Sequence, residues 1–296
     1  MATSLPVGVL RAMRPQQWTK NVLVFAAPVA AGVIRQTDVL VDTLIAFAAF
    51  SLAASGTYLL NDARDVEADR QHPTKRNRPI AAGIVPVSLA VVVGVVLLVV
   101  SLGVALLANR NLAYTIAAYL AVTVAYNLWL KEEAILDLLA VAAGFVLRAV
   151  AGAAAAAVPI SEWFFIVTSF GALLMVTGKR EGELHELGAE AGSVRKTLGV
   201  YTPNFLAYVR GVATAVVLIA YCLWAFESAR ASHSSDTATI WFQLSIVPFA
   251  VAILRYALLI DQGKGGEPET LVMHDRTLQV AGVLWAIIYG YGIYIA

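Results

Sequence analysis

The chain contains 296 residues, of which 59% are hydrophobic and 14% are charged, and its formal net charge is +1. Soluble domains carry about 25% charged residues, so this composition is typical of a membrane protein. A net charge so close to zero gives no bulk electrostatic basis for binding nucleic acid. The single cysteine, Cys222, excludes an intramolecular disulfide framework and a cysteine-cluster metal site.

The first apolar stretch, residues 22–33, follows Arg11 and Arg14 and has the outline of a signal peptide. However, polar residues between positions 16 and 21 interrupt the approach to it, and further apolar stretches follow. We therefore predict that this stretch is a retained first helix.

Apolar segments long enough to cross a bilayer recur along the whole chain, because a hydrocarbon core of about 30 Å needs about 20 residues of helix. The predicted segments cover residues 19–34, 39–60, 84–108, 112–130, 134–157, 160–178, 204–226, 239–260 and 277–295. The sequence therefore predicts an all-α, polytopic membrane protein with nine transmembrane helices, forming a single domain over residues 1–296.

The basic residues are distributed unequally between the two sets of connections. The N-terminal segment and the loops 61–83, 131–133, 179–203 and 261–276 hold fifteen of the twenty-one Lys and Arg residues, and the opposite loops hold three. Cytoplasmic loops carry the excess of Lys and Arg. We therefore predict a plasma-membrane protein with its N-terminus and these four loops in the cytoplasm and its C-terminus outside.

An acidic motif follows the second predicted span. If the helix continues past Leu60, Asp62, Asp65 and Asp69 lie on one face, with Asn61 beside them. Clustered like charges repel, whereas Mg²⁺ takes oxygen ligands and joins carboxylates to substrate phosphates. The motif predicts a magnesium–diphosphate site. The alternative is a solvated helix end whose acids are balanced by neighbouring arginines.

A basic segment comes directly after the acidic motif and contains Lys75, Arg76 and Arg78. A metal-bound diphosphate needs carboxylates for the metal and guanidinium or ammonium groups for the remaining phosphate oxygens. The order of the two segments supports this pairing. The alternative is a topogenic loop that contacts anionic lipid.

A second mixed-charge segment lies at residues 177–187, at the cytoplasmic end of the sixth predicted span. Lys179 and Arg180 suit a phosphate ligand, while Glu181, Glu183 and Glu186 suit a metal ion or sugar hydroxyl groups.

Two of the charged residues within predicted spans stand out, because a charge near the bilayer centre costs about 2.5–3.5 kcal/mol. Asp137 and Arg148 are eleven residues apart, which returns nearly to the same helix face and predicts one polar cavity. The alternatives are that Asp137 is interfacial and that Arg148 reaches the headgroups or bonds to the backbone. Lys20, beside the interfacial Trp18, is a further candidate phosphate ligand.

These residues resemble the UbiA-type polyprenyl transferase superfamily of integral membrane enzymes, over most of the chain. The motifs that carry the resemblance are Asn61-Asp62-x-x-Asp65-x-x-x-Asp69, Lys75-x-x-Arg78-Pro79, and Tyr126-Asn127 with Lys131, Asp137 and Arg148. The resemblance implies nine helices around a central cavity open to lipid. It also implies Mg²⁺ and a diphosphate at a cytoplasmic mouth formed by loops 61–83 and 179–203.

One departure from the family pattern points to a particular branch. Typical members carry a second Asp-rich stretch between helices six and seven, but no Asp occurs here from residue 171 to 210. The basic stretch Lys179-Arg180-Glu181-Gly182-Glu183, together with Arg14-Pro15-x-Gln17-Trp18-x-Lys20-Asn21, is similar to the actinobacterial branch that uses phosphoribosyl pyrophosphate. That branch transfers the 5-phosphoribosyl group to a polyprenyl (decaprenyl) phosphate and makes precursors of cell-wall arabinan.

The resemblance implies a role for each candidate residue in this Mg²⁺-dependent phosphoribosyl transfer. Asp62, Asp65 and Asp69 would be the metal ligands, and Asp62, Asp65 and Lys179 the catalytic residues. The implied substrate-binding residues are Lys20, Asn61, Arg64, Arg70, Lys75, Arg78, Tyr126, Arg148, Lys179, Arg180 and Glu181. The lipid phosphate would attack the ribose C1 without a strong general base, because it is already an anion.

Two other functions compete with phosphoribosyl transfer. One is a prenyltransferase that moves an isoprenoid from a prenyl diphosphate to an aromatic or quinone acceptor. The other is a membrane carrier that uses Asp137 and Arg148 in its pathway. The acceptor chain length, the number of metal ions and assembly into a homo-oligomer are left open by the sequence.

Overall fold

The computed structural model describes residues 4–231, 236–266 and 268–295, and every regular element in these residues is helical. The chain packs as two compact units. Unit 1 runs to Asn127 and takes in Leu147–Pro159; unit 2 comprises Leu128–Val146 and the chain from Ile160 onward. The boundary divides helix α7 (Leu136–Ala155) between them. The predicted all-α class is confirmed for the described residues.

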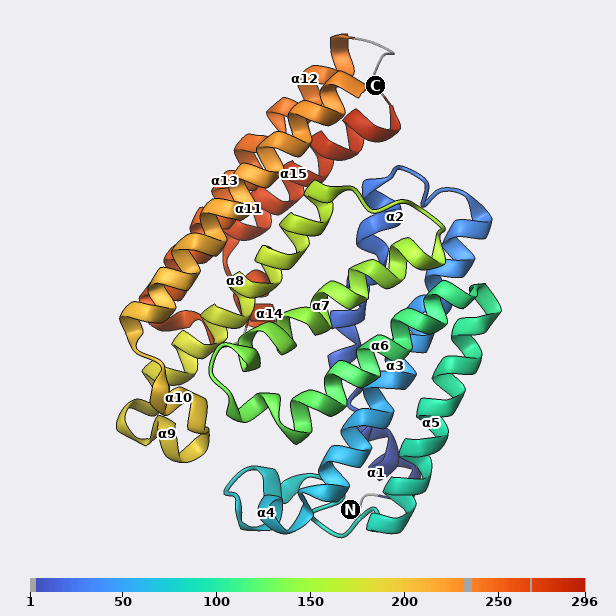
Figure 1. The fold of residues 1–296 in the computed structure, drawn as a ribbon, viewed down its shortest axis with the longest axis vertical. Helices are drawn as coiled ribbons and strands as arrows, with labels where there is room; N and C mark the ends of the chain where they lie inside the picture. The colour runs from blue at the N-terminus through green and yellow to red at the C-terminus, as the bar shows by residue number, and fades with distance from the viewer. Residues whose placement is uncertain (1–3, 232–235, 267, 296) are drawn as a thin grey trace. The chain divides into compact units, whose positions relative to one another are not determined.

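Unit 1 is built around the long helix α3. Its elements are α1 (Leu5–Ala12), η1 (Pro15–Phe25), α2 (Ala26–Ala30), α3 (Thr37–Arg64), α4 (Val66–Gln71), η2 (Lys75–Asn77), α5 (Val87–Ala108), α6 (Arg110–Leu128) and the second part of α7. Helices α3 and α5 run side by side (Figure 1). A Cβ on Gly56 would lie 2.8 Å from the carbonyl oxygen of Gly94, so glycine allows these two backbones to approach closely.

The first predicted span, residues 19–34, differs from a continuous α-helix. It forms the 3₁₀ segment η1 followed by the single turn α2, in which Pro28 has no backbone N–H to donate. Polar contacts fix η1 on α3, because Trp18 Nε1 donates to Ser55 Oγ at 3.0 Å and Asn21 Nδ2 to Ser51 Oγ at 3.1 Å. Tertiary contacts therefore override the apolar pattern in this segment.

Unit 2 holds the remaining helices. They are η3 (Leu130–Glu132), the first part of α7, α8 (Glu162–Leu187), η4 (Gly188–Glu190), α9 (Ala191–Val194), α10 (Lys196–Val200), α11 (Pro203–Ala231), α12 (Asp236–Leu244), α13 (Ile246–Leu259), η5 (Ile260–Lys264), α14 (Pro268–His274) and α15 (Arg276–Tyr294). Helices α8 and α11 pack together along their lengths. Aromatic rings from α11, α12 and α15 fill the other end of the unit, where Trp224 meets Phe242 edge-on and Trp285 stacks on Tyr289.

Within the described residues, six helical segments are long and apolar enough to cross a membrane. They are Thr37–Arg64, Val87–Ala108, Leu136–Ala155, Pro203–Ser228, Ile240–Lys264 and Arg276–Tyr294. The nine predicted spans are therefore not all matched by length and apolar content. Of the other three, residues 19–34 form η1 and α2, while α6 and α8 are helices at the predicted positions that fall outside this set.

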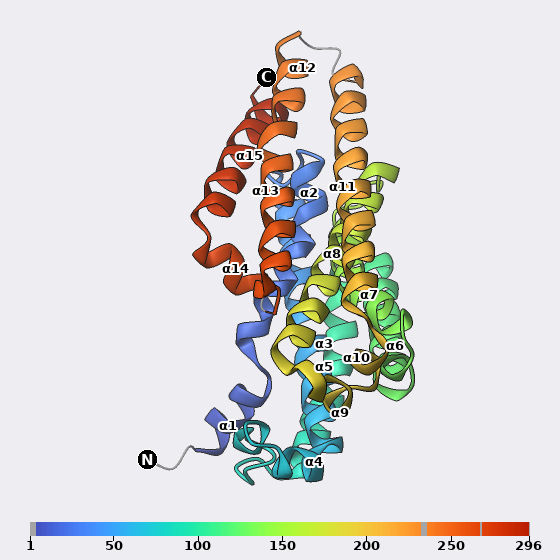
Figure 2. The ribbon, with the colours of Figure 1, turned by 90° about the vertical axis from the view of Figure 1, so that its left-hand side faces the viewer.

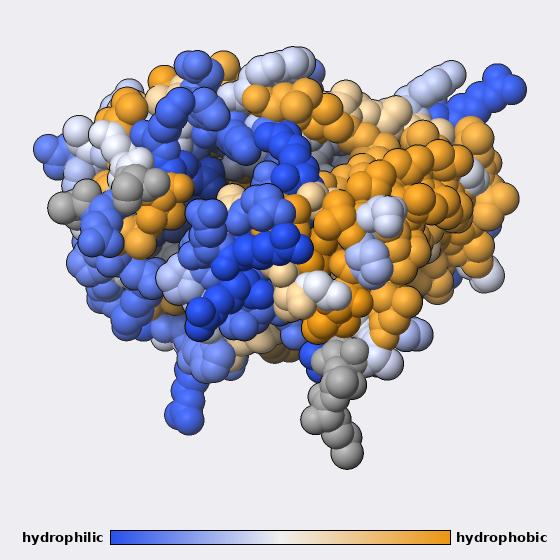
Figure 3. Space-filling view, turned by 90° about the horizontal axis from the view of Figure 1, so that it is seen from below, coloured by the Kyte–Doolittle hydropathy of each residue, from blue (hydrophilic) through white to orange (hydrophobic). Residues whose placement is uncertain are grey.

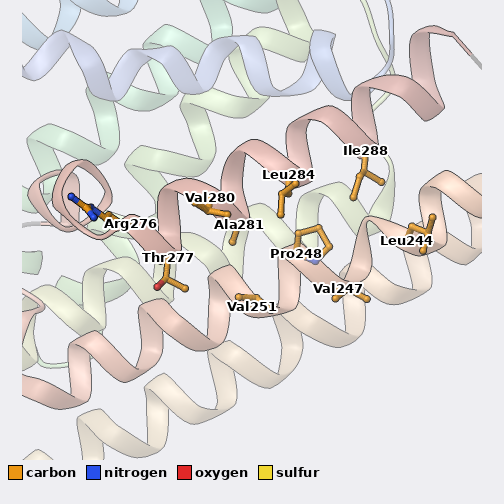
Figure 4. A pocket seen from close by; sticks show the side chains of 10 residues that line it. All are labelled: Leu244, Val247, Pro248, Val251, Arg276, Thr277, Val280, Ala281, Leu284 and Ile288. Carbon is orange, nitrogen blue, oxygen red and sulfur yellow. The ribbon is translucent and has the colours of Figure 1, made fainter.

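The surfaces of these helices are strongly apolar. Val92, Val99 and Leu107 of α5 are exposed, and in Figure 3 hydrophilic residues gather around α4 beside the apolar surface of α5. In unit 2, an apolar groove of about 610 Å³ runs between α13 and α15, with Val251 and Leu284 on its walls and Arg276 at one end (Figure 4). Exposed apolar surface of this extent is expected where lipid replaces water.

Candidate functional site

The acidic motif forms a buried pair of carboxylates in unit 1. Helix α3 ends at Arg64, Asp65 leaves the helical conformation (φ −92°, ψ 12°), and α4 starts at Val66. This break lets Asp69 of α4 converge with Asp62 of α3, and both side chains are 5% exposed. Buried carboxylates are costly unless they are paired, so their partners define the site.

Arg14 is the first partner. Its guanidinium donates to both carboxylate oxygens of Asp62, at 2.5 and 2.8 Å, and lies 4.7 Å from the ring centre of Tyr58. Arg14 has a left-handed backbone (φ 55°) and precedes Pro15, which disfavours the right-handed helical conformation. Helices α1 and α4 lie at the same end of unit 1 (Figure 2), so the turn after α1 brings Arg14 to the acidic pair.

Arg78 is the second partner and joins the two carboxylates. Its Nη1 lies 3.1 Å from Asp62 Oδ1 and 2.7 Å from Asp69 Oδ2. One cationic nitrogen therefore occupies the point at which both carboxylates converge. Arg78 follows the short element η2, which turns the chain back toward α3.

The predicted third carboxylate does not join this pair. Asp65 is exposed, and its Oδ1 lies 3.8 Å from Arg64 Nε. Among the described residues, no three His, Cys, Asp or Glu side chains form a group able to hold a metal ion. The structure therefore brings Asp62 and Asp69 together around Arg78 and leaves Asp65 outside.

Two of the other predicted ligands of unit 1 bond to groups outside this pair. Arg64 donates to the carbonyl of Asn127 at 3.3 Å, and Arg70 donates to Glu67 at 2.7 Å. Lys75 is exposed, while Lys20, Asn61 and Tyr126 are half-buried. These positions place Arg70 and Lys75 on the hydrophilic surface around α4.

Arg148 lies in the core of unit 1. Its Nε donates to Asn21 Oδ1 at 2.8 Å, its Nη2 to the Tyr119 hydroxyl at 3.3 Å, and its guanidinium lies over the rings of Phe50 and Tyr119. Asn21 is fully buried, so Arg148 connects η1 to helices α6 and α7. These contacts of Arg148 hold the helices of unit 1 together.

Asp137 has a separate set of partners in unit 2. Its side chain is fully buried and accepts hydrogen bonds from Arg180 Nε at 3.1 Å, Thr197 Oγ1 at 3.2 Å and the Tyr201 hydroxyl. The Tyr201 hydroxyl in turn accepts from the backbone N–H of Ile135 at 2.7 Å. Burial and the adjacent carboxylate raise the pKa of the Tyr201 hydroxyl above its ordinary value, so it remains a donor at neutral pH.

The two basic residues of the α8 segment therefore differ in their exposure to solvent. Arg180 is buried and bonds to Asp137 and Glu183, whereas Lys179 is exposed. Glu181 pairs with Arg210 at 3.0 Å, and burial raises the pKa of the Glu181 carboxyl. Arg180 thus connects α8 to α7, and Asp137 connects both to the segment before α11.

Sequence reasoning did not assign Arg14, Thr197 or Tyr201 to any site. The proline after Arg14 was the only local signal for its unusual backbone, and no pattern indicated its distant partner Asp62. Thr197 and Tyr201 carry no charge, so nothing in the sequence distinguished them from neighbouring polar residues.

Comparison with known proteins identifies the family. The model of the UbiA prenyltransferase family matches residues 22–278. The chain is 46% identical over 291 residues to decaprenyl-phosphate phosphoribosyltransferase of Mycobacterium tuberculosis H37Rv, covering 97% of this chain and 94% of that one. It is 44% identical to the protein of the same name from Corynebacterium glutamicum, covering 99% and 88%.

Solved structures share the fold. A UbiA homologue from Archaeoglobus fulgidus bound to GPP and Mg²⁺ has a TM-score of 0.70 at 17% identity, covering 98% of this chain and 100% of that one. An apo UbiA homologue from Aeropyrum pernix has a TM-score of 0.62 at 16% identity, covering 95% and 98%. The predicted family is confirmed. This chain is a multi-pass membrane protein that belongs to the UbiA prenyltransferase family.

Proposed function

We propose that this protein transfers the 5-phosphoribosyl group of phosphoribosyl pyrophosphate to a polyprenyl phosphate and releases pyrophosphate. The structural observation that carries the proposal is the buried Asp62–Asp69 pair with Arg14 and Arg78 around it. The relatives at 44–46% identity that are named decaprenyl-phosphate phosphoribosyltransferase support the choice of donor and acceptor.

The residues of the pair fit a magnesium ion. Their donor atoms are carboxylate oxygens, which Mg²⁺ prefers, and both carboxylates converge on a point that a cationic nitrogen occupies. Asp62 and Asp69 would hold the metal, and Asp65 is proposed as a further ligand from the exposed helix break. When bound, Mg²⁺ would neutralise charge on the leaving diphosphate.

Basic side chains of unit 1 would hold the rest of the diphosphate. Arg14 and Arg78 lie at the carboxylates, and the residues proposed to orient the donor around them are Lys20, Asn61, Arg64, Arg70, Lys75 and Tyr126. Phosphate oxygens bind guanidinium groups through paired, charge-assisted hydrogen bonds. The high density of cations suits a donor that carries a 5-phosphate as well as a diphosphate.

Lys179 is proposed to contact the 5-phosphate or the acceptor phosphate, because it is the exposed cation of the α8 segment. Arg180, Glu181 and Arg148 are proposed to position neighbouring elements, since their side chains bond to other protein groups. In the reaction, an oxygen of the lipid phosphate bonds to the ribose C1 while the C1–O bond to the diphosphate breaks, and the electron pair leaves with the diphosphate. Catalysis would rest on positioning and electrostatic stabilisation.

The distribution of Lys and Arg supports an orientation with the N-terminus and the acidic pair in the cytoplasm and the C-terminus outside. A cytoplasmic site is also where a phosphorylated sugar donor would be available to a plasma-membrane enzyme.

The test is incubation of the purified protein with Mg²⁺, phosphoribosyl pyrophosphate and a polyprenyl phosphate, followed by mass spectrometry of the lipid. The expected product is a lipid heavier by one phosphoribosyl group. A parallel reaction supplies a prenyl diphosphate and an aromatic acceptor. Activity only in the parallel reaction would overturn the proposal in favour of prenyl transfer, and inactivity in both would leave a carrier as the better interpretation.

A further inference from the structure

The carboxylates proposed to bind metal are already occupied by the protein's own cations. Asp62 Oδ1 accepts from both Arg14 and Arg78, and Asp62 Oδ2 accepts from Arg14. Asp69 Oδ2 accepts from the same Arg78 nitrogen that contacts Asp62. Three of the four carboxylate oxygens therefore accept hydrogen bonds from guanidinium groups.

A metal ion and these guanidinium groups compete for the same oxygens. Mg²⁺ demands near-ideal octahedral geometry and gives up its waters reluctantly, and a second cation at the convergence point would be repelled by Arg78. If a metal ion displaced the arginines without replacing their partners, two guanidinium groups about one-third exposed would lose their charge-assisted bonds. Bare metal is therefore a poor ligand for this site.

A diphosphate changes that balance. Its oxygens accept paired hydrogen bonds from guanidinium groups at least as well as carboxylates do, so Arg14 and Arg78 can exchange Asp62 and Asp69 for phosphate. The carboxylate oxygens are then free for a metal ion that bridges to the same diphosphate. The diphosphate therefore draws the arginines away from the carboxylates, and the metal ion on the carboxylates leaves the arginines available to the diphosphate.

We propose that Arg14 and Arg78 exclude bare divalent metal from Asp62 and Asp69 and release these carboxylates only when a diphosphate arrives. This inference rests on the metal–diphosphate site of the proposed function and adds a selection rule to it: metal and diphosphate bind together. Linkage then requires that pyrophosphate raise metal affinity by the same factor as metal raises pyrophosphate affinity.

The backbone around Arg14 supports a dedicated role. Its left-handed conformation before Pro15 is unfavourable for a residue other than glycine and persists only where surrounding contacts hold it. The bond from Ser55 Oγ to the Met13 carbonyl, at 3.1 Å, anchors the preceding residue on α3. Arg14 is thus held against Asp62 from both its side chain and its backbone.

The experiment is equilibrium dialysis of the full-length, detergent-purified protein against Mn²⁺, with and without inorganic pyrophosphate. Dialysis equalises free Mn²⁺ and its pyrophosphate complex on both sides, so the excess metal on the protein side is the bound metal. For the natural protein we expect weak binding of Mn²⁺ alone and an increase in affinity of about tenfold or more with pyrophosphate, within the usual range of coupling between sites.

Four variants separate the roles of the residues. In Arg78→Gln and Arg14→Gln, Mn²⁺ alone should bind more tightly and the enhancement by pyrophosphate should shrink. Arg78→Lys should restore exclusion of bare Mn²⁺, because one ammonium can bridge both carboxylates. Arg110→Gln is the control, since Arg110 is exposed and lies outside the acidic and basic segments, and it should behave as the natural protein.

The outcomes distinguish this inference from the proposed function. Equal Mn²⁺ affinity with and without pyrophosphate in the natural protein would overturn the inference and leave the metal site intact. If Mn²⁺ fails to bind under both conditions, the metal site fails and the inference with it. A coupling factor unchanged in both glutamine variants that remain monodisperse would also overturn the inference, because the arginines would then not control metal access.

Discussion

Arg180 and Asp137 form a buried ion pair, with Arg180 Nε 3.1 Å from Asp137 Oδ2 and side chains 3% and 0% exposed. Asp137 is at the start of α7, and Arg180 lies near the C-terminal end of α8. Thr197 and Tyr201 donate to the same carboxylate. One carboxylate thus connects three segments of unit 2: α7, α8 and the stretch from Thr197 to Tyr201.

Breaking this pair should destabilise the protein strongly. Arg180→Gln leaves the Asp137 carboxylate buried with too few partners, a loss of about 3–5 kcal/mol for a buried ion pair. We expect a clearly lower melting temperature in detergent, measured by intrinsic fluorescence.

The control is Lys196→Gln, which removes the exposed 3.0 Å ion pair with Glu132. Exposed pairs contribute about 0–1 kcal/mol, so its melting temperature should hardly change. An equal effect of both variants would show that burial of Asp137 does not govern the stability of this cluster.

Removing the acidic residues should abolish the transfer reaction. Asp62→Asn and Asp65→Asn are each expected to lower phosphoribosyl transfer by about a hundredfold or more, in the range found when one electrostatic catalytic group is removed. The measurement is the rate of lipid product formation, with membrane insertion checked by fractionation.

Glu67→Gln provides the comparison, because Glu67 is exposed and forms an ion pair with Arg70. Normal activity of Asp65→Asn would restrict the metal ligands to Asp62 and Asp69. Normal activity of both aspartate variants would mean that the acidic segment is only a solvated helix end.

A methyl group on Gly182 should disturb the packing behind the basic segment of α8. A Cβ there would lie 2.3 Å from the backbone nitrogen of Gly266, a contact that real Cβ atoms do not make. Gly182→Ala must therefore displace the segment after η5 or bend α8, and we expect a lower melting temperature and reduced transfer activity.

Gly171→Ala is a matched control on the same helix, because a Cβ at Gly171 would have no neighbour within 4 Å. It should be neutral or slightly stabilising, since Ala favours the helix by about 1 kcal/mol over Gly. A neutral Gly182→Ala would show that the segment around Gly266 adapts without cost.

Truncating Arg148 should loosen η1 from the core of unit 1. Arg148→Met keeps much of the apolar volume but leaves Asn21 Oδ1 without its charged donor. Hydrogen bonds to charged groups contribute about 1.5–3 kcal/mol, so a lower melting temperature is expected.

Limited proteolysis would show where the change acts, since cleavage should increase around η1. Arg110→Met tests the loss of an exposed arginine, and it should leave both the melting temperature and the cleavage pattern unchanged.

Much of the fold followed from local patterns. The apolar stretches at 39–60, 84–108 and 277–295 became α3, α5 and α15, because the period and length of an apolar helix are encoded within each stretch. Residues 19–34 do not form the continuous helix that their apolar pattern predicts. Their apolar content is typical of a span, but contacts of Trp18 and Asn21 with α3 and the missing N–H of Pro28 favour a 3₁₀ segment and one α-helical turn.

The candidate site was predictable in its chemistry and unpredictable in its pairing. Spacing alone put Asp62, Asp65 and Asp69 on one face, yet the helix breaks at Asp65 and leaves that side chain exposed. The sequence predicts Arg180 as a phosphate ligand because it follows the basic Lys179, whereas its buried partner Asp137 lies 43 residues earlier.

Composition, apolar spacing and motifs were sufficient for the membrane class, the family and the acidic motif, because each of these is encoded within short stretches of chain. Tertiary structure alone decided which cation holds each carboxylate. Arg14 meets Asp62 across 48 residues and Arg78 meets it across 16, and such pairings depend on where α1, α3 and η2 pack. The cost of burying an unpaired charge enforces these contacts, and it operates only once the helices have excluded water from the site.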